Sequence, residues 1–416
     1  MVSATRVQPS SGRIDSIDVL RGITILVMLF VNDVAGVAGT PAWMLHIQPP
    51  DADGMTFVDI VFPAFLFIVG MAIPFAIGRR LERGEAIWDV WKHILIRTAG
   101  LLVIGVFMVN ASSMSDEAFP GRHVWTLLMY AGVILVWNRP PSDRAPGRNV
   151  QLTMRWAGVL LLIALAVLFR GSGDPGLIEL RPRWWGILGL IGWSYLVACM
   201  AYIALRRSHV GMLGVMGLLY CLYFADKAGL FEGLAWLTQW VNIGGTLGSH
   251  PAITVSGVVL GMILTKSSPI ESDGARIKWG LLYGAGLALA GHLLHAMADI
   301  DQAFIINKIF ATPPWCLWTS AITAWIWVAL YWLIDVRRWN RWTIVVEPAG
   351  QNSLFAYILA PILYAAFALI DSMTGVNPYA MLGQSFAVGF WRALIFAFAM
   401  TWLAGALRHV GIRLKL

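Results

Sequence analysis

The chain has 416 residues, of which 58% are hydrophobic and only 13% are charged, with a formal net charge of +7. Soluble domains contain about 25% charged residues, so this chain has too few charged side chains to cover a water-facing surface. The composition excludes a disordered chain, a disulfide scaffold and a basic nucleic-acid-binding domain. It predicts an all-α, polytopic integral membrane protein.

Apolar stretches of about 20 residues predict the membrane-spanning helices in chain order. They number about 11–12, because the span at 123–137 is short and the span at 210–225 is alternatively a re-entrant segment. Residues 1–12 are polar and lack the apolar core of a signal peptide, so the first span is expected to direct its own insertion. The predicted spans are 18–36, 57–78, 93–110, 123–137, 153–170, 184–205, 210–225, 250–265, 279–298, 315–334, 350–370 and 387–407.

The placement of Lys and Arg in the connecting loops predicts the orientation of these helices. With the N-terminus in the cytoplasm, the large majority of the 30 Lys and Arg fall in cytoplasmic segments, as the positive-inside rule requires. Both termini are therefore expected in the cytoplasm, and the loop at 37–56 on the outer side. Anionic lipid of the inner leaflet accounts for the net positive charge, so no nucleic acid is expected as a partner.

Cysteine and histidine spacing gives no sign of a metal site. The three cysteines, Cys199, Cys221 and Cys316, lie in or at the ends of apolar stretches and are expected to be small buried residues. His292 and His295 share one face of a predicted span near its outer end but lack a third ligand, so they are expected to line a polar cavity.

The first predicted span carries polar residues at both ends. Asp18 and Arg21 lie three residues apart on one helical face, which favours a local ion pair or a phosphate-bearing ligand facing Arg21 from inside. Asn32 lies eleven residues beyond Arg21, roughly 16 Å deeper. Asn32 and Asp33 are expected to face other helices or a wet cavity. Asp33 needs a partner or a proton, and no cation is near it in sequence.

A histidine follows in the next loop, and an aspartate opens the second span. His46 lies about ten residues beyond the first span, and Asp59 falls in the first turn of the second, where the helix dipole favours an anion. Asn32, Asp33, His46 and Asp59 are therefore expected to meet at the outer mouth of this hairpin.

Two regions of the chain carry motifs that resemble a known family, the heparan-alpha-glucosaminide N-acetyltransferase family. The first region reads IDSIDVLRGITILVMLFVND, then a loop histidine, then DGMTFVDIVFPAFLFIVGMAIP. The second reads INKIFATPPWCLWTSAITAWIWVALYWLIDVRRW, followed by GQNSLFAYILAP. The resemblance covers the hairpin at 13–80 and the segment at 279–370, with a weaker middle at 111–250. It implies that residues 1–416 form a single transmembrane acyltransferase-like domain.

The resemblance implies an enzyme that takes acetyl from acetyl-CoA on the cytoplasmic side and gives it to an amino sugar on the far side. His46 matches the catalytic histidine of the family, and Asn32 matches its active-site asparagine. The loop departs from the usual His-Ala-x-Trp-x-Gly pattern, because it runs from His46 through Ile-Gln-Pro-Pro-Asp-Ala-Asp to Gly54. This difference in the loop concerns the identity of the acceptor more than acyl transfer itself, because His46 and Asn32 are both present.

The residue types suggest a role for each candidate. His46 is suited to accept a proton from a sugar ammonium, Asn32 to donate to a developing oxyanion, and Asp59 or Asp33 to orient the imidazole. An acetyl-histidine intermediate on His46 is the alternative route. The predicted coenzyme contacts are Arg21, Arg79, Arg80 and Arg97, and the predicted acceptor cavity is lined by His292, His295, Asn307 and Lys308.

A second class of function is a transporter of amino sugars or related solutes, which would need a continuous cavity but no coenzyme site. The expected partners are the lipid bilayer, acetyl-CoA as co-substrate and an amino-sugar acceptor, and a homodimer is compatible with the sequence. No metal is expected. The expected location is a bacterial inner membrane.

Overall fold

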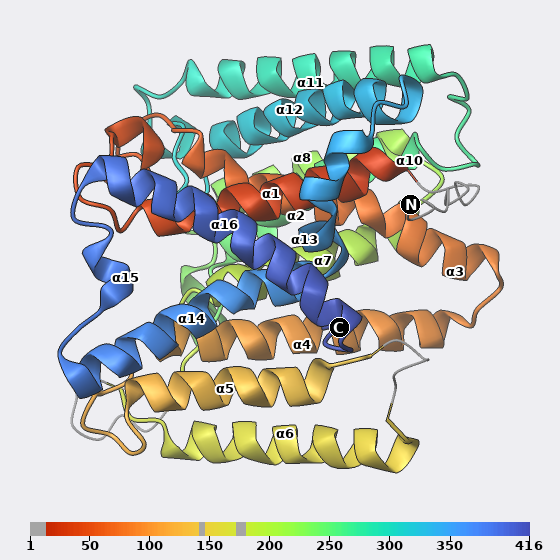
Figure 1. Ribbon diagram of the computed structural model, residues 1–416. Coiled ribbons are helices and arrows are strands. Elements are labelled where there is room, and N and C mark those ends of the chain that lie inside the picture. The colour runs from red at the N-terminus through yellow and green to blue at the C-terminus, as the bar shows by residue number, and fades with distance from the viewer. Residues whose placement is uncertain (1–13, 141–145, 172–179) are drawn as a thin grey trace.

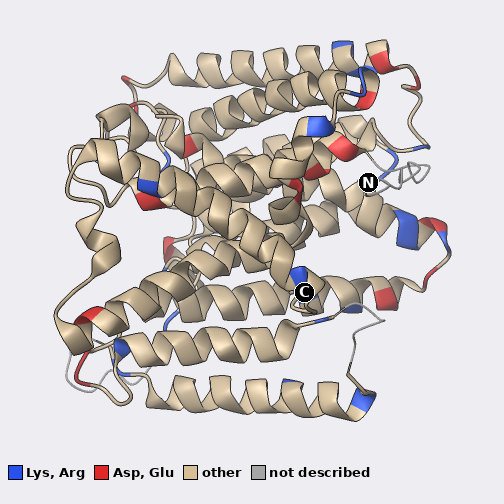
Figure 2. Cartoon of the chain, viewed as in Figure 1, with Lys and Arg blue, Asp and Glu red and all other residues tan. Residues whose placement is uncertain are grey.

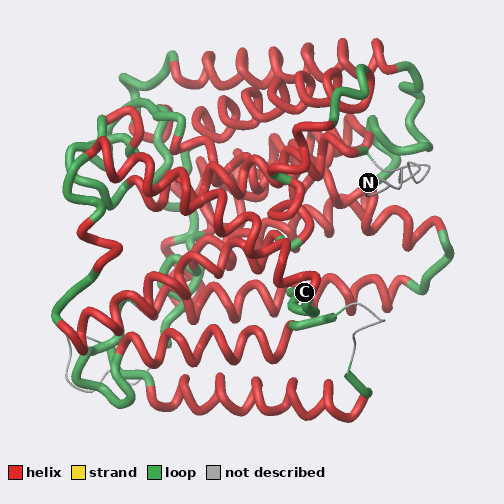
Figure 3. The backbone as a smooth tube through the Cα atoms, in the orientation of Figure 1, coloured by secondary structure: helices red, strands yellow, loops and turns green. Residues whose placement is uncertain are grey.

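The structure is a computed structural model that describes residues 14–140, 146–171 and 180–416. Within these ranges the regular elements are helices, and no strand is formed (Figure 3). The expectation that residues 1–12 are not a signal peptide lies outside the described residues.

Ten spans within these ranges are long and apolar enough to cross a membrane, which makes the chain an integral membrane protein. With α1 (Asp15–Val34) and the shorter apolar α5 (Arg122–Trp137), they coincide with the twelve predicted spans, so the predicted helix bundle is confirmed. The region at 210–225 lies in a continuous helix rather than a re-entrant segment. The ten are α2–η2–α3 (Val58–Glu82), α4 (Ile87–Ala111), α6 (Arg148–Leu168), α7 (Gly186–Leu205), α8 (His209–Lys227), η4–α10 (Ile243–Met262), α11 (Asp273–His295), α12–η6 (Pro313–Val336), α14 (Ser353–Thr374) and α16 (Phe386–His409).

Short helices connect these spans. They are η1 (Ala42–Met44), η3 (Glu232–Leu234), α9 (Ala235–Thr238), η5 (Gln302–Phe304), η7 (Arg341–Val345), α13 (Glu347–Gln351) and α15 (Pro378–Met381).

The long helices lie side by side, so the molecule has two ends, at which the helices begin and finish (Figure 1). The start of α1 and the C-terminal segment lie at one end, called here the terminal end, and the loop at 35–57 lies at the other, called the loop end. Helices α11 and α12 flank one side of the bundle, α4, α5 and α6 flank the opposite side, and α1, α2 and α10 lie between them. Charged residues gather toward the two ends of the helices, with few along their middles (Figure 2).

Helices α2 and α10 pack closely at the centre because glycines line their contact. A Cβ atom added at Gly70, Gly257 or Gly261 would collide with backbone atoms of the opposite helix. Small residues at this spacing let helix backbones approach closely in a membrane, where van der Waals packing drives association. Every residue of α10 is buried. The α2–α10 pair therefore forms a fixed centre on which the site is built.

The first helix is capped by a residue far away in sequence. No side chain near the start of α1 caps it, and the carboxylate of Asp335 in η6 instead accepts hydrogen bonds from the backbone N–H groups of Asp15 and Ser16, both at 3.1 Å. These groups lack partners inside the helix and favour a nearby anion. Asp335 therefore fixes the start of the helix that carries Arg21 and Asn32.

Replacing Asp335 with alanine is expected to lower the free energy of unfolding by about 1 kcal/mol, the usual cost of losing a helix cap. Denaturant unfolding of the purified protein in detergent measures this, with the exposed loop variant Asp299→Ala as control. Equal stability of the two variants would show that the cap contributes nothing.

Candidate active site

The loop end holds a histidine–carboxylate pair. His46 follows η1 in the loop, and its Nδ1 lies 2.7 Å from Oδ1 of Asp59 in the first turn of α2. Asp59 is only 1% exposed, whereas His46 is 46% exposed. Oδ2 of Asp59 accepts hydrogen bonds from the backbone N–H of Thr56 at 3.0 Å and of Ile47 at 3.2 Å. A carboxylate held in this way favours the tautomer with a proton on Nδ1, which leaves Nε2 of His46 as the basic nitrogen.

A lysine amine faces the same imidazole. Nζ of Lys308 lies 3.1 Å from both ring nitrogens of His46 and 3.9 Å from Oδ1 of Asp59. The Lys308 ammonium thus lies as close to Nε2, the ring nitrogen that Asp59 leaves basic, as to Nδ1. Burial lowers the pKa of Lys308, and the Asp59 carboxylate opposes that shift. The basic nitrogen of His46 thus already faces an amine.

The loop that carries His46 is held by a second loop between α11 and α12. Asn307 is fully buried, and its side-chain amide donates to the carbonyl groups of Pro50 at 2.8 Å and Ala52 at 3.0 Å. Nε2 of His295 lies 2.7 Å from Oδ2 of Asp53. Of the four predicted acceptor-cavity residues, Lys308 reaches His46, and Asn307 and His295 hold its loop. The fourth, His292, is exposed, and its side chain forms no hydrogen bond with a residue in the described ranges.

Asp33 lies apart from His46, in an ion-pair network of its own. Its carboxylate accepts hydrogen bonds from the hydroxyl groups of Tyr364 at 2.9 Å and Tyr379 at 2.7 Å. Its Oδ2 lies 3.2 Å from Nη2 of Arg392, which lies in α16. Of the two carboxylates predicted to orient the imidazole, Asp59 is the one hydrogen-bonded to His46, and Asp33 is bonded to other partners. The distant cation Arg392 supplies the partner that the local sequence lacks.

Asn32, next to Asp33 on α1, has an exposed side chain. No hydrogen bond joins it to His46 or to any other residue in the described ranges. Its exposed amide is thus available to a bound molecule.

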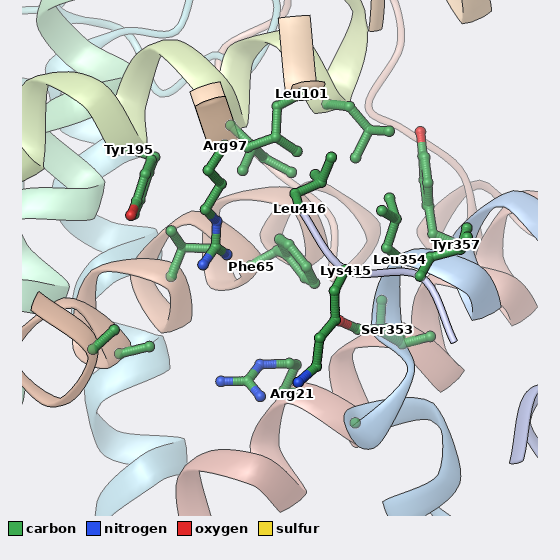
Figure 4. A pocket seen from close by; sticks show the side chains of 18 of the residues that line it. Arg21, Phe65, Arg97, Leu101, Tyr195, Ser353, Leu354, Tyr357, Lys415 and Leu416 are labelled. Atoms are coloured by element: carbon green, nitrogen blue, oxygen red, sulfur yellow. The ribbon is translucent and has the colours of Figure 1, made fainter. Parts of the chain in front are cut away.

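A cavity of about 530 Å³ extends into the bundle from the terminal end. Figure 4 shows the cationic ends of Arg21, Arg97 and Lys415 directed into one space. Apolar residues of α1, α2 and α7 line the part of the cavity that lies deeper in the bundle. The basic residues around the cavity are Arg21, Arg80, Arg97, Arg139 and Lys415, with His93, and the apolar ones include Ile25, Met28, Phe62, Phe65, Val69, Leu188 and Ile191.

Some of the basic side chains around this cavity form ion pairs with acidic residues, and Arg97 forms none with a described residue. Arg21 pairs with Asp18 at 2.9 Å, and Arg80 pairs with Glu85 at 2.7 Å. The guanidinium of Arg97 lies over the ring of Tyr195 at 4.7 Å, and its buried Nε has no hydrogen-bond partner within the described ranges. Three of the four predicted coenzyme residues line this cavity. The fourth, Arg79, lines a neighbouring hollow of about 130 Å³.

Helix α2 connects the cavity to the histidine pair. Phe62 lines the cavity and follows Asp59 by three residues, which places it on the same helical face about 4.5 Å along the axis. Arg80 lines the cavity near the other end of the same span. One helix thus carries the carboxylate that orients His46 and one wall of the basic cavity.

Sequence reasoning missed several residues of these sites. Arg139 and Lys415 satisfy the positive-inside rule without a ligand, and nothing near Arg392 in sequence indicates that it pairs with Asp33. The GQNS segment (residues 350–353), which is part of the family resemblance, is the signal that could have indicated this cavity, because Gly350, Gln351 and Ser353 line it. Within the described ranges, no group of three or more His, Cys, Asp or Glu has an arrangement that would hold a metal ion.

Comparisons with known proteins agree with the expected resemblance. The chain is 34% identical over 98 residues to the heparan-alpha-glucosaminide N-acetyltransferase of Homo sapiens and 33% identical over 101 residues to that of Mus musculus. Each match covers 24% of this chain but only 14% of the relative. These matches confirm the predicted resemblance over about a quarter of this chain. The family model described as "Domain of unknown function (DUF5009)" matches residues 13–233, more than half of the chain, and the chain therefore belongs to that family.

Proposed function

We propose that the protein is a transmembrane acyltransferase that takes acetyl from acetyl-CoA and transfers it to the amine of an amino sugar across the membrane. The observation that carries this proposal is the basic cavity along α2, which approaches the His46–Asp59 pair to within about one helical turn. The names of the two relatives support an acetyl transfer. We place the terminal end in the cytoplasm, on the distribution of Lys and Arg in the sequence.

The cavity suits a coenzyme with an anionic end and a long thioester arm. Arg21, Arg80 and Arg97 would hold the phosphates, because guanidinium groups form paired hydrogen bonds with phosphate oxygens. The apolar residues beyond them, such as Phe65 and Met28, would cover the arm. Such an arrangement directs the acyl group toward the loop end.

At the loop end, His46 would accept a proton from the acceptor ammonium, and Asp59 would stabilise the imidazolium. The freed amine forms the new C–N bond, the C–S bond of the thioester breaks, and the leaving thiolate takes up the proton that the attacking nitrogen loses as it becomes an amide. Lys308 places a positive charge beside the acceptor amine, which favours the uncharged, reactive amine. Asn32 would donate to the developing oxyanion. Attack by His46 itself, giving an acetyl-histidine, uses the same geometry.

The test is transfer of radiolabelled acetyl from acetyl-CoA to glucosamine by purified protein in nanodiscs, together with binding of coenzyme A. Arg97→Gln is expected to weaken coenzyme A binding about 10- to 100-fold, the worth of a charge-assisted hydrogen bond, and the loss should shrink at high salt. Lys92→Gln is the matched control, because Lys92 is exposed on the same helix outside the cavity. Solute uptake without acetyl transfer or coenzyme binding would make the protein a carrier instead.

A further inference from the structure

The segment after α16 returns to the basic cavity. Leu414, Lys415 and Leu416 all line it, and Figure 4 shows the Lys415 side chain extending into the same space as Arg21. Residues 412–416, called here the tail, therefore form one wall of a cavity that is otherwise built from helices. Leu414 is buried, so the tail is packed against the protein rather than lying over it.

The tail is held on one side by the end of α5. The backbone N–H of Arg139 donates to the carbonyl of Arg413 at 2.8 Å, and the N–H of Lys415 donates to the carbonyl of Trp137 at 3.1 Å. Between them, Oδ1 of Asn138 accepts from the N–H of Arg413 at 2.8 Å. These three bonds fix the backbone on both sides of Leu414.

Asn352 of the GQNS motif holds the tail from the other side. Its amide nitrogen donates to the carbonyl groups of Ala404 and Ile412, both at 3.2 Å, and its Oδ1 accepts from the N–H of Leu414 at 3.3 Å. The side chain is 1% exposed, and its bonds join the end of α16 to the tail. A residue whose polar atoms are used in this way positions the tail and does not itself contact a ligand.

The tail adds the positive charge of Lys415 to a cavity that is already lined by several arginines. Burial lowers the pKa of Lys415, and Arg413, Arg139 and Arg408 lower it further. Neither Arg139 nor Lys415 forms an ion pair with a residue in the described part of the chain. Charges of one sign held together in this way favour an anion in the space between them.

We propose that the tail is part of the coenzyme site, with Lys415 binding a phosphate group and with Asn352 and Asn138 as positioning residues that hold Lys415 in the cavity. The inference rests on the proposed function, since it assigns the anion to coenzyme A. The proposal gives the GQNS motif a physical role. Three of its residues line the cavity, and Asn352 holds the tail that forms one wall of the cavity.

The experiment measures the dissociation constant of coenzyme A for full-length variants in neutral phosphatidylcholine nanodiscs. Lys415→Gln is expected to weaken binding about 10-fold, Lys415→Arg to restore most of it, and the control Lys92→Gln to leave it unchanged. Coenzyme A should also slow trypsin cleavage after Arg413 and Lys415 in the wild type. Asn352→Ala should bind coenzyme A more weakly and be cleaved faster at these two sites.

Equal coenzyme A binding by Lys415→Gln and wild type would overturn the inference even if Asn352→Ala fails to fold. If the wild type binds no coenzyme A, the proposed function fails as well, so the two failures are distinguishable. Protection of the tail by phosphatidylglycerol but not by coenzyme A would show that the anion is a lipid headgroup, and the inference would be wrong.

Discussion

Replacing His46 with alanine is expected to reduce acetyl transfer about 10²- to 10⁴-fold, the usual effect of losing a positioned general base. The variant should fold and bind coenzyme A, because His46 is half exposed and does not line the basic cavity. Transfer to glucosamine and coenzyme A binding, measured on the same preparation, separate the chemical step from binding. His123→Ala is the control, since His123 lies in the first turn of α5, at the same end of the bundle.

Transfer by His46→Ala at the wild-type rate would refute the mechanism assigned to this loop. Incubating the wild type with acetyl-CoA and no acceptor distinguishes the two routes, because only the covalent route leaves an acetyl group on the His46 peptide. Asn32→Ala should lose about 10²- to 10³-fold in rate, as expected for one oxyanion donor.

Replacing Arg392 with alanine is expected to destabilise the protein by about 3–5 kcal/mol, because it leaves the Asp33 carboxylate buried without its cation. Asp33 is 4% exposed, and the side chain of Arg392 is 9% exposed, so little water reaches either group. The two tyrosine hydroxyls alone cannot neutralise the carboxylate. Denaturant unfolding in detergent measures the loss.

The double variant Asp33→Leu/Arg392→Met provides the matched comparison. It removes both charges together and should recover most of the lost stability, because apolar residues often replace a buried ion pair at little cost. A double variant as unstable as Arg392→Ala would contradict this account. So would a loss below about 1 kcal/mol for Arg392→Ala, the range of an exposed ion pair.

The spans were predictable because each depends on the local run of apolar residues. The His46–Asp59 pair was partly predictable, since a single hairpin brings the loop and the start of α2 together. The partner of Asp33 was not, because Arg392 lies 359 positions further along the chain and only helix packing joins them. The tail was missed for a related reason: the rule that places basic residues at cytoplasmic helix ends already accounted for Lys415.

The close glycine contact between α2 and α10 limits how far these two helices can slide past each other. Carriers with alternating access rock one group of helices against another about a central site. At Gly70, Gly257 and Gly261 there is no space for even one added carbon, so sliding at this contact would force backbone atoms into one another. We therefore expect α2 and α10 to move as one rigid body, and an acyl group to pass along α2 while the two helices keep their register.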